Sequence, residues 1–182
     1  HEFKKAGNKL YFYEHKPLEN GLPNYEELKN VYDFIYAEIK KGNIVSVKTI
    51  KDGGLAIALA KMSFGNHLGA EISADDKVLL EKNLASLVIE STENIENILI
   101  KEIGAVNSSN TLNINGLEYS IDNLLEVWTG TFKKLFPTEE RKAEVVTFDE
   151  SLNGINKSSI EIISHKIARP KVFIPLFPGT NC

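Results

Sequence analysis

The sequence predicts an α+β domain in which helices cover a mixed β-sheet. Short runs rich in β-branched and aromatic residues alternate with a few amphipathic helical patterns, without a regular strand-helix-strand series. Asn115-Gly116 stands between two such runs and is a strong signal for a β-hairpin, so at least one pair of strands is expected to be antiparallel. No internal repeat or low-complexity tract interrupts the pattern.

Composition and charge exclude several classes of partner. The chain has 182 residues, of which 42% are hydrophobic and 25% charged, and its formal net charge is −4. Charges of one sign form no long run, so we expect no nucleic acid and no membrane as a partner. No apolar stretch is long enough to cross a bilayer, and the first residues lack the apolar core of a signal peptide. We therefore expect a cytoplasmic protein, in agreement with its single cysteine, Cys182.

The first half of the chain predicts two strands and two helices. Residues 10–13 have strand composition and are followed by a cluster of turn formers. A helix is expected from Asn24, a good N-cap, to Gly42, because apolar residues recur at helical spacing between lysines and glutamates. The β-branched residues 44–47 predict a short buried strand. The small and apolar residues 55–64 then predict a helix that packs on both sides.

The second half adds strands and a last helix. Residues 69–72 and 87–90 predict strands, whereas residues 98–106 fit either a helix end or a strand. The last helix follows the hairpin, capped by Ser120 or Asp122, and is closed by a proline at position 137.

The apolar residues of this last helix fall on one face. We assign that face, with Trp128 and Phe132, to the core rather than to a stacking platform for a ligand.

Three segments are predicted along the chain. Residues 1–137 form a folded lobe, and the charged and polar residues 138–169 form a linker. Residues 170–182 contain an apolar β-rich run that is predicted to be the first strand of a truncated next domain, since a strand at the end of the chain has no neighbours with which to pair. Because the chain also starts without methionine, we expect it to be a fragment.

The turn between the strand at 44–47 and the helix at 55–64 carries the candidate binding site. A strand end, two glycines and a helix N-terminus bring backbone N–H groups together with the positive helix end, an arrangement that holds anions. Two lysines and a threonine hydroxyl lie beside it, and Asp52 can cap the helix or hold a magnesium-bound water. The predicted phosphate-binding or nucleotide-binding residues are Lys48, Thr49, Lys51, Asp52, Gly53 and Gly54. The alternative is that Asp52 is only the N-cap and the glycines only allow a tight turn.

A longer stretch around this turn resembles a known family. Residues 51–62 give an aspartate, two glycines, a leucine and an alanine-rich helix, and residues 64–72 lead into a glycine-containing strand. This stretch resembles the C-terminal lobe of the aminoimidazole ribonucleotide synthetase superfamily, and the resemblance extends over about residues 43–136. It implies the mixed sheet covered by helices of that lobe. Many members carry a His and a Ser shortly before the Asp-Gly-Gly, where this sequence has lysines, so the turn is expected either to face a phosphate or to support the lobe structurally.

The end of the chain carries a second resemblance. Residues 169–174 with 177–182 look like the first strand and turn of a class I glutamine amidotransferase domain. A synthetase lobe followed by such a domain implies a purine-biosynthesis ligase that transfers ammonia from glutamine to formylglycinamide ribonucleotide, with ATP and Mg²⁺ as cofactors. The remaining domains of the same chain, an ATP-binding lobe and the glutaminase domain, would be its partners, and the fragment alone would be inactive. The alternatives are a nucleotide-binding lobe of another superfamily member and a non-catalytic scaffold domain.

No catalytic residue is predicted within this chain, and its metal ligands stay undetermined. Cys182 lies beside a first strand, whereas the nucleophilic cysteine that the resemblance implies lies well downstream in a strand-to-helix elbow. The histidines show no metal-ligand spacing with carboxylates, so we expect lone surface side chains and no zinc. They are His1, His15, His67 and His165.

Overall fold

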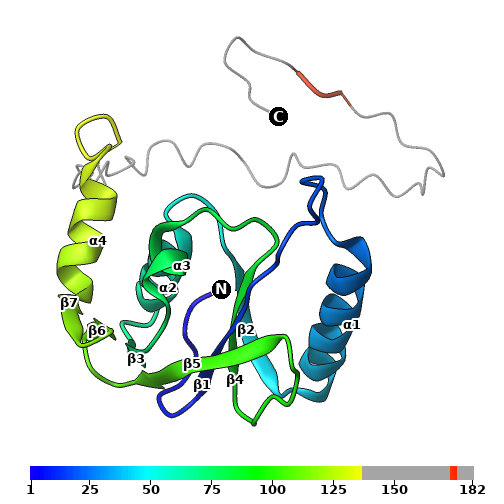
Figure 1. Ribbon diagram of the computed structural model, residues 1–182. Coiled ribbons are helices and arrows are strands. Elements are labelled where there is room, and N and C mark those ends of the chain that lie inside the picture. Colours follow the sequence, from blue (N-terminus) through cyan, green and yellow to red (C-terminus); the bar gives the residue numbers. More distant parts are fainter. Residues whose placement is uncertain (137–172, 176–182) are drawn as a thin grey trace, which may run out of the picture. The chain divides into compact units, whose positions relative to one another are not determined.

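A mixed seven-stranded sheet forms the centre of the fold in the computed structural model, which describes residues 1–136 and 173–175 (Figure 1). The strand order is β2-β4-β1-β5-β3-β6-β7, and every neighbouring pair is antiparallel except β3 and β6, which are parallel. The strands are β1 (Lys9–Tyr13), β2 (Ile44–Thr49), β3 (Gly69–Ile72), β4 (Leu87–Ser91), β5 (Ile100–Asn107), β6 (Thr111–Ile114) and β7 (Leu117–Ser120). The described helices are α1 (Tyr25–Lys41), α2 (Gly54–Ser63), α3 (Asp76–Leu80) and α4 (Ile121–Gly130). The predicted α+β class is therefore confirmed.

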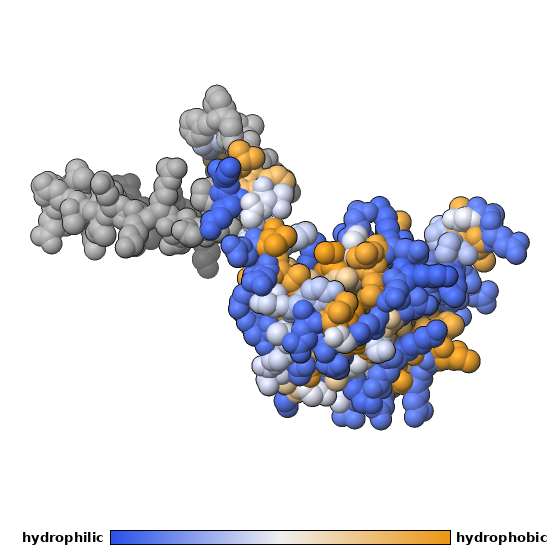
Figure 2. Space-filling view, turned by 60° about the vertical axis from the view of Figure 1, so that its left-hand side comes forward, coloured by the Kyte–Doolittle hydropathy of each residue, from blue (hydrophilic) through white to orange (hydrophobic). Residues whose placement is uncertain are grey.

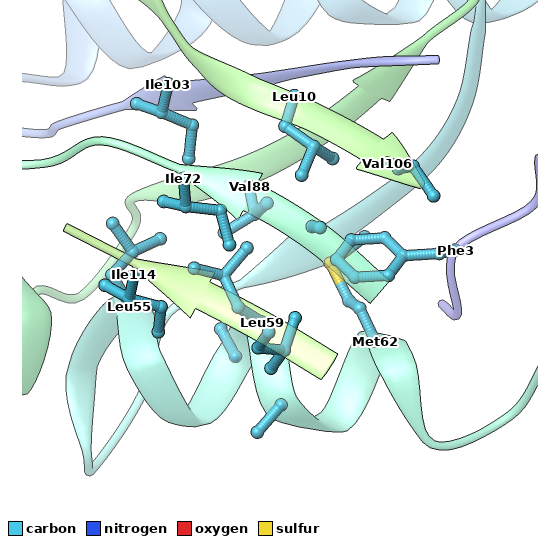
Figure 3. Packing of buried hydrophobic residues seen from close by; sticks show 14 of the residues in the cluster. Phe3, Leu10, Leu55, Leu59, Met62, Ile72, Val88, Ile103, Val106 and Ile114 are labelled. Carbon is cyan, nitrogen blue, oxygen red and sulfur yellow. The ribbon is translucent and has the colours of Figure 1, made fainter. Parts of the chain in front are cut away.

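Helices cover both faces of the sheet. Successive side chains of a strand point to opposite faces, so one strand supplies residues to the core on each side. On β1, Tyr11 and Tyr13 belong to a cluster with Val31 of α1, whereas Leu10 and Phe12 belong to the core beneath α2. Figure 3 shows this second core, in which side chains of α2 lie against strand residues. Strands β1, β4 and β5 contribute side chains to both clusters, so the two helix layers pack against opposite faces of the same central strands.

Local signals explain the best-predicted elements. Asn24 caps α1 by accepting a hydrogen bond from the Glu27 N–H at 3.2 Å, and Gly42 ends the helix at φ 83°. Asn115 and Gly116 both take positive φ values, 52° and 83°, as a tight hairpin turn between β6 and β7 requires. The helix over residues 55–64 and the strands at 69–72 and 87–90 are also confirmed.

The N-terminal segment is fastened to the sheet by a buried carboxylate. Glu90 on β4 is fully buried and accepts hydrogen bonds from the Lys4 N–H at 2.9 and 3.0 Å, from the Lys5 N–H at 3.2 Å and from Asn8 Nδ2 at 2.7 Å. Phe3, also fully buried, reaches the core beside α2 (Figure 3). One acidic side chain thus accepts from three donors of a segment that forms no strand of its own.

The assignment of the last helix to the core was wrong. Ser120 caps α4, as predicted, but Trp128 is 50% and Phe132 60% exposed, and only the first turn reaches the core, through Ile121 and Leu124. The reason is position: α4 follows β7, which is an edge of the sheet, so no further strand lies beneath the rest of the helix. Figure 2, turned to bring this side of the molecule forward, shows apolar side chains gathered on the surface.

One further expectation needs correction, and two segments that the sequence left open are now defined. The run at 44–47, predicted to be a buried strand, belongs to β2, an edge strand that buries Ile44 and Ser46 and leaves alternate residues half-buried. The helix α3, which is only five residues long, was not predicted. The ambiguous stretch at 98–106 is resolved as a strand, β5.

The predicted linker over 138–169, His165, Cys182 and most of the strand predicted over 170–182 lie outside the described residues. Phe173–Pro175, which are described, take no helix or strand conformation, and Phe173 is 88% exposed. The three predicted segments therefore stay a prediction. Within the described part of the chain, no helix has the length and apolar character needed to cross a membrane.

Candidate functional site

The predicted turn lies where β2 ends and α2 begins. Ile50 anchors it: its side chain is buried, and its N–H donates to the Ser86 carbonyl at 2.9 Å. Gly53 and Gly54 follow with φ values of 85° and 65°, a left-handed conformation that side-chain-bearing residues rarely adopt. The turn is therefore built from one buried residue, Ile50, directly after the strand, and two glycines in the left-handed conformation.

Gly54 also allows close packing with α3. A Cβ atom at this position would lie 2.5 Å from the Leu79 carbonyl oxygen and 2.7 Å from the Leu80 carbonyl carbon, both in the backbone. The glycines therefore have a structural role, which was the alternative interpretation of this turn. It does not exclude a role in binding for the polar side chains beside them.

Asp52 is not the N-cap of α2, so that part of the prediction was wrong. The N-cap is Gly53, and no side chain makes a capping hydrogen bond. The Asp52 carboxylate instead lies 2.9 Å from the Lys82 ammonium, whose hydrogen bond and charge hold the pKa of Asp52 below its usual value. The N–H groups of the first turn of α2 are consequently left without a capping side chain.

A cavity of about 190 Å³ opens at this turn. Its lining includes five of the six predicted site residues, with Gly53 as the exception, and adds Ile57, Ala58 and Lys61 from α2. The structure therefore brings the predicted residues together around one small space. The full lining is Lys48, Thr49, Lys51, Asp52, Gly54, Ile57, Ala58 and Lys61.

Three lysines converge on the cavity, and Lys61 is the one that the sequence analysis missed. Lys48 and Lys61 are half-buried and Lys51 is exposed. Burial lowers the pKa of Lys48, and the charges of Lys61 and Lys51 lower it further. Among the residues that the structure describes, none of the three forms an ion pair with an acidic side chain. We call Lys48, Lys51 and Lys61 the lysine triad.

Helix geometry could have indicated Lys61. It lies three residues after Ala58 and seven after Gly54, so all three share one face of α2. Its Nζ lies over the Trp128 ring at 3.8 Å from the centroid, a cation–π contact that holds the ammonium in place. Trp128, predicted to be core, is instead a half-exposed neighbour of the site.

None of the histidines that the structure describes, His1, His15 and His67, lines this cavity. His15, predicted to be a surface side chain, is buried, and its Nδ1 lies 3.3 Å from the Tyr13 hydroxyl. Burial, and a hydrogen bond from the Tyr13 hydroxyl to Glu27, raise the pKa of Tyr13. Across residues 1–136 and 173–175, no three His, Cys, Asp or Glu side chains come together in a group that could hold a metal ion.

The curated relatives and the solved structures that resemble this chain include the same kind of protein, PurL. No family model matches the chain. It is 47% identical over 49 residues to the phosphoribosylformylglycinamidine synthase subunit PurL of Zymomonas mobilis, a match that covers 27% of this chain and 7% of the relative. The PurL subunit of Sulfurimonas denitrificans is 28% identical over 123 residues, covering 62% of this chain and 17% of the relative. The chain thus spans less than a fifth of the length of these curated relatives.

Solved structures show the same fold. Thermotoga maritima PurL complexed with AMPPCP superposes with a TM-score of 0.57 at 12% identity, covering 68% of this chain and 26% of that one. The PurLQS structure from the same organism gives a TM-score of 0.56 at 11% identity, covering 68% and 27%. The mixed sheet with its helices is therefore an arrangement found in PurL proteins.

Proposed function

We propose that this chain is a segment of a phosphoribosylformylglycinamidine synthase, the purine-biosynthesis ligase that converts formylglycinamide ribonucleotide, ATP and glutamine to formylglycinamidine ribonucleotide. The observation that carries the proposal is that sequence relatives and superposable structures agree: both are PurL proteins, and they match up to 62% of the chain by sequence and 68% by structure. The solved PurL structures include complexes with ATP and with FGAR, which are the ligands that such an activity requires.

Within that enzyme, the turn before α2 would face a phosphate group. Five of the six predicted site residues line the same cavity, and the lysine triad supplies positive charge there. When bound, ATP with Mg²⁺ would supply the phosphoryl group that activates the amide oxygen of the substrate. The residues of this chain would bind and orient a phosphate rather than take part in bond making, since the cavity contains no nucleophile paired with a base.

Magnesium does not fit this cavity. Mg²⁺ prefers carboxylate and phosphate oxygens. The only carboxylate in the lining, Asp52, is paired with Lys82, and three ammonium groups surround the space. Any Mg²⁺ of the full enzyme would therefore be held by other parts of the protein.

The proposal extends to the other domains. Residues 170–182 would begin a class I glutamine amidotransferase domain that delivers ammonia from glutamine, and an ATP-binding lobe of the same chain would complete the synthetase site. The Thermotoga maritima PurLQS structure is named as an assembly of PurL with further components, which supports such partners. The complete enzyme would act in the cytoplasm, without nucleic acid or membrane partners.

The isolated chain is expected to be inactive. It spans 26–28% of the solved PurL chains with which it superposes, so most of a synthetase site would come from elsewhere. Coupled assays for ADP and glutamate release, with FGAR, ATP, Mg²⁺ and glutamine present, should give the same rates with and without the purified chain. Turnover that depends on the chain would contradict the proposal.

Reading the coding sequence beyond residue 182 is an independent check. A Gly-x-Cys-x-Gly nucleophile elbow downstream would support the ligase. Its absence would favour a nucleotide-binding lobe of another member of the superfamily.

A further inference from the structure

We propose that the open edge of β2 accepts an added strand from a peptide segment in which acidic and apolar side chains alternate. Such a site is separate from the ligase activity proposed above and does not depend on it. The strand β2 lies at one end of the sheet, and among the described residues no further strand pairs with it. An edge strand leaves backbone N–H and C=O groups unpaired, and peptide recognition by strand addition uses these groups.

The hydrogen bonds around β2 show which of its backbone groups face away from the sheet. Ile50, directly after the strand, donates its N–H at 2.9 Å to the carbonyl of Ser86, directly before β4. Neighbouring residues of a strand point to opposite sides, so Val47 and Thr49 point outward. The Val47 carbonyl confirms this direction, because it accepts a hydrogen bond at 2.9 Å from Nδ1 of the exposed residue His1. The edge is therefore accessible to a donor from outside the sheet.

The outer edge of β2 is regular over most of its length. A register shift lies between Ile44 and Ser46, but from Ser46 to Thr49 each residue pairs in turn with one residue of β4. No proline interrupts the strand. Prolines and bulges are two of the features that prevent an edge from pairing. The stretch from Ser46 to Thr49 contains neither, so its backbone can accept a further strand.

A cavity of about 300 Å³ lies along this edge. Residues 44–47 of β2 line it, together with Ile39 of α1 and with His1 and Lys4 of the N-terminal segment. The helix α1 packs on one face of the sheet, whereas Lys4 is held by Glu90, whose neighbours on its own face belong to the other core. A cavity that wraps around a strand edge in this way suits an extended chain, because such a chain places alternate side chains on the two faces.

A buried polar group without a partner lies in the same cavity. Ser46 is 7% exposed, and its hydroxyl makes no hydrogen bond within the part of the chain that the structure describes. A buried polar group left unpaired costs free energy, which a polar side chain beside it on an added strand would recover. On the opposite face, Ile44 and Val47 pack with the apolar cluster beneath α1. The added strand is therefore expected to alternate polar and apolar side chains.

Charge selects the kind of polar side chain. Lys48 lies on the same face as Ser46, and in the described part of the chain it forms no ion pair with an acidic side chain. The cavity lining adds His1 and Lys4 and contains no acidic residue, although Glu2 pairs with Lys4. An acidic strand would pair with Lys48. A second copy of this chain would instead bring two Lys48 side chains close together on one face, which disfavours self-association through this edge.

Titration of the 182-residue chain with synthetic peptides tests the proposal. The probe is an acetylated and amidated heptapeptide, Thr-Val-Glu-Val-Glu-Val-Thr, and the control peptide has lysine in place of both glutamates. In NMR spectra of the ¹⁵N-labelled chain, the glutamate peptide should bind saturably and slow hydrogen exchange at the Val47 and Thr49 amides. The lysine peptide is expected to bind at least about tenfold more weakly, since like charges directly opposite are unfavourable.

Proline substitutions test whether the backbone of β2 forms the contact. Val47→Pro removes an outward N–H without breaking a bond to β4, so the sheet should persist while peptide binding weakens by about tenfold or more. Glu118→Pro is the matched control on the other edge strand, β7. Glu118 follows the residue that closes the hairpin, so its N–H also points outward, and this variant should bind the peptide as the wild type does.

A charge reversal gives a readout that does not depend on the stability of a proline variant. Lys48→Glu should invert the preference, so that the lysine peptide binds more tightly than the glutamate peptide. Sedimentation of the chain without peptide shows whether a second copy uses the edge. A dimer that Val47→Pro dissociates and Glu118→Pro does not would identify the occupant as a second copy and overturn the proposal.

Three peptide results would also overturn it: no slowing of exchange at Val47 and Thr49, equal binding by Val47→Pro and Glu118→Pro, or equal affinity of the wild type for both peptides. None of these results bears on whether a longer chain has ligase activity. Conversely, loss of the ligase proposal through the downstream coding sequence leaves the peptide results intact.

Discussion

Replacing Glu90 with alanine is expected to lower the free energy of unfolding by roughly 3–4 kcal/mol, since a buried donor that loses its acceptor costs about 1–3 kcal/mol. The Glu90 carboxylate accepts hydrogen bonds from the backbone N–H groups of Lys4 and Lys5 and from the side chain of Asn8. Alanine removes the acceptor and leaves a cavity, so the N-terminal segment should detach. Urea unfolding measures the loss, and hydrogen exchange should show faster exchange at the Lys4 and Lys5 amides.

Two companion variants show whether the carboxylate itself is responsible. Glu90→Gln preserves shape but turns one acceptor into a donor that faces other donors, so an intermediate loss is expected. Glu71→Ala is the matched control, because Glu71 is an exposed glutamate on β3 and such substitutions usually change stability by less than about 0.5 kcal/mol. Equal midpoints for Glu90→Ala and Glu71→Ala would show that the N-terminal segment does not depend on Glu90.

Gly54→Ala is the second substitution with a large expected effect. Alanine at φ 65° carries backbone strain of about 1–2 kcal/mol, and its Cβ would lie 2.5 Å from the Leu79 carbonyl oxygen. Since that atom belongs to the backbone, α3 must move away from α2. We expect a total loss of roughly 3 kcal/mol or more, of the size seen when strain and disrupted packing combine, together with weaker phosphate binding at the cavity that Gly54 lines.

Gly116→Ala isolates the contribution of packing. Gly116 also has a positive φ, 83°, but no atom lies within 4 Å of the Cβ that alanine would add. The hairpin variant should therefore lose only the strain, about 1–2 kcal/mol, as measured by urea unfolding. If the free energy of unfolding fell by the same amount in both variants, the close packing of Gly54 against α3 would contribute nothing to stability.

Elements with local signals could be predicted from the sequence, and those shaped by distant partners could not. The helix α1 has its own cap and stop residues, and the β6–β7 hairpin has its own turn. By contrast, β5 places Ile100, Ile103 and Val106 three residues apart, which imitates a helix. The register between β1 and β5 shifts opposite Leu10 and Tyr11, so Ile103 and Val106 reach the same core despite their odd spacing.

The same limit applies to the candidate site. Lys48 and Lys51 flank the turn in sequence and were found there, but Lys61 joins them only after α2 completes two turns. The ion pair between Asp52 and Lys82 joins residues 30 positions apart, so nothing in the turn could have indicated it. The error at α4 is of another kind: helical periodicity identifies an apolar face, but it does not say whether anything covers that face.

The contact between Lys61 and Trp128 makes intrinsic tryptophan fluorescence a probe of this part of the protein. Trp128 is the only tryptophan in the sequence, so the intrinsic indole emission comes from one position, with an ammonium 3.8 Å above the ring. An ammonium at that distance sets the local electric field at the indole, and any displacement of Lys61 toward the cavity changes that field. Fluorescence of the unlabelled protein therefore follows the position of a single lysine side chain at the edge of the cavity.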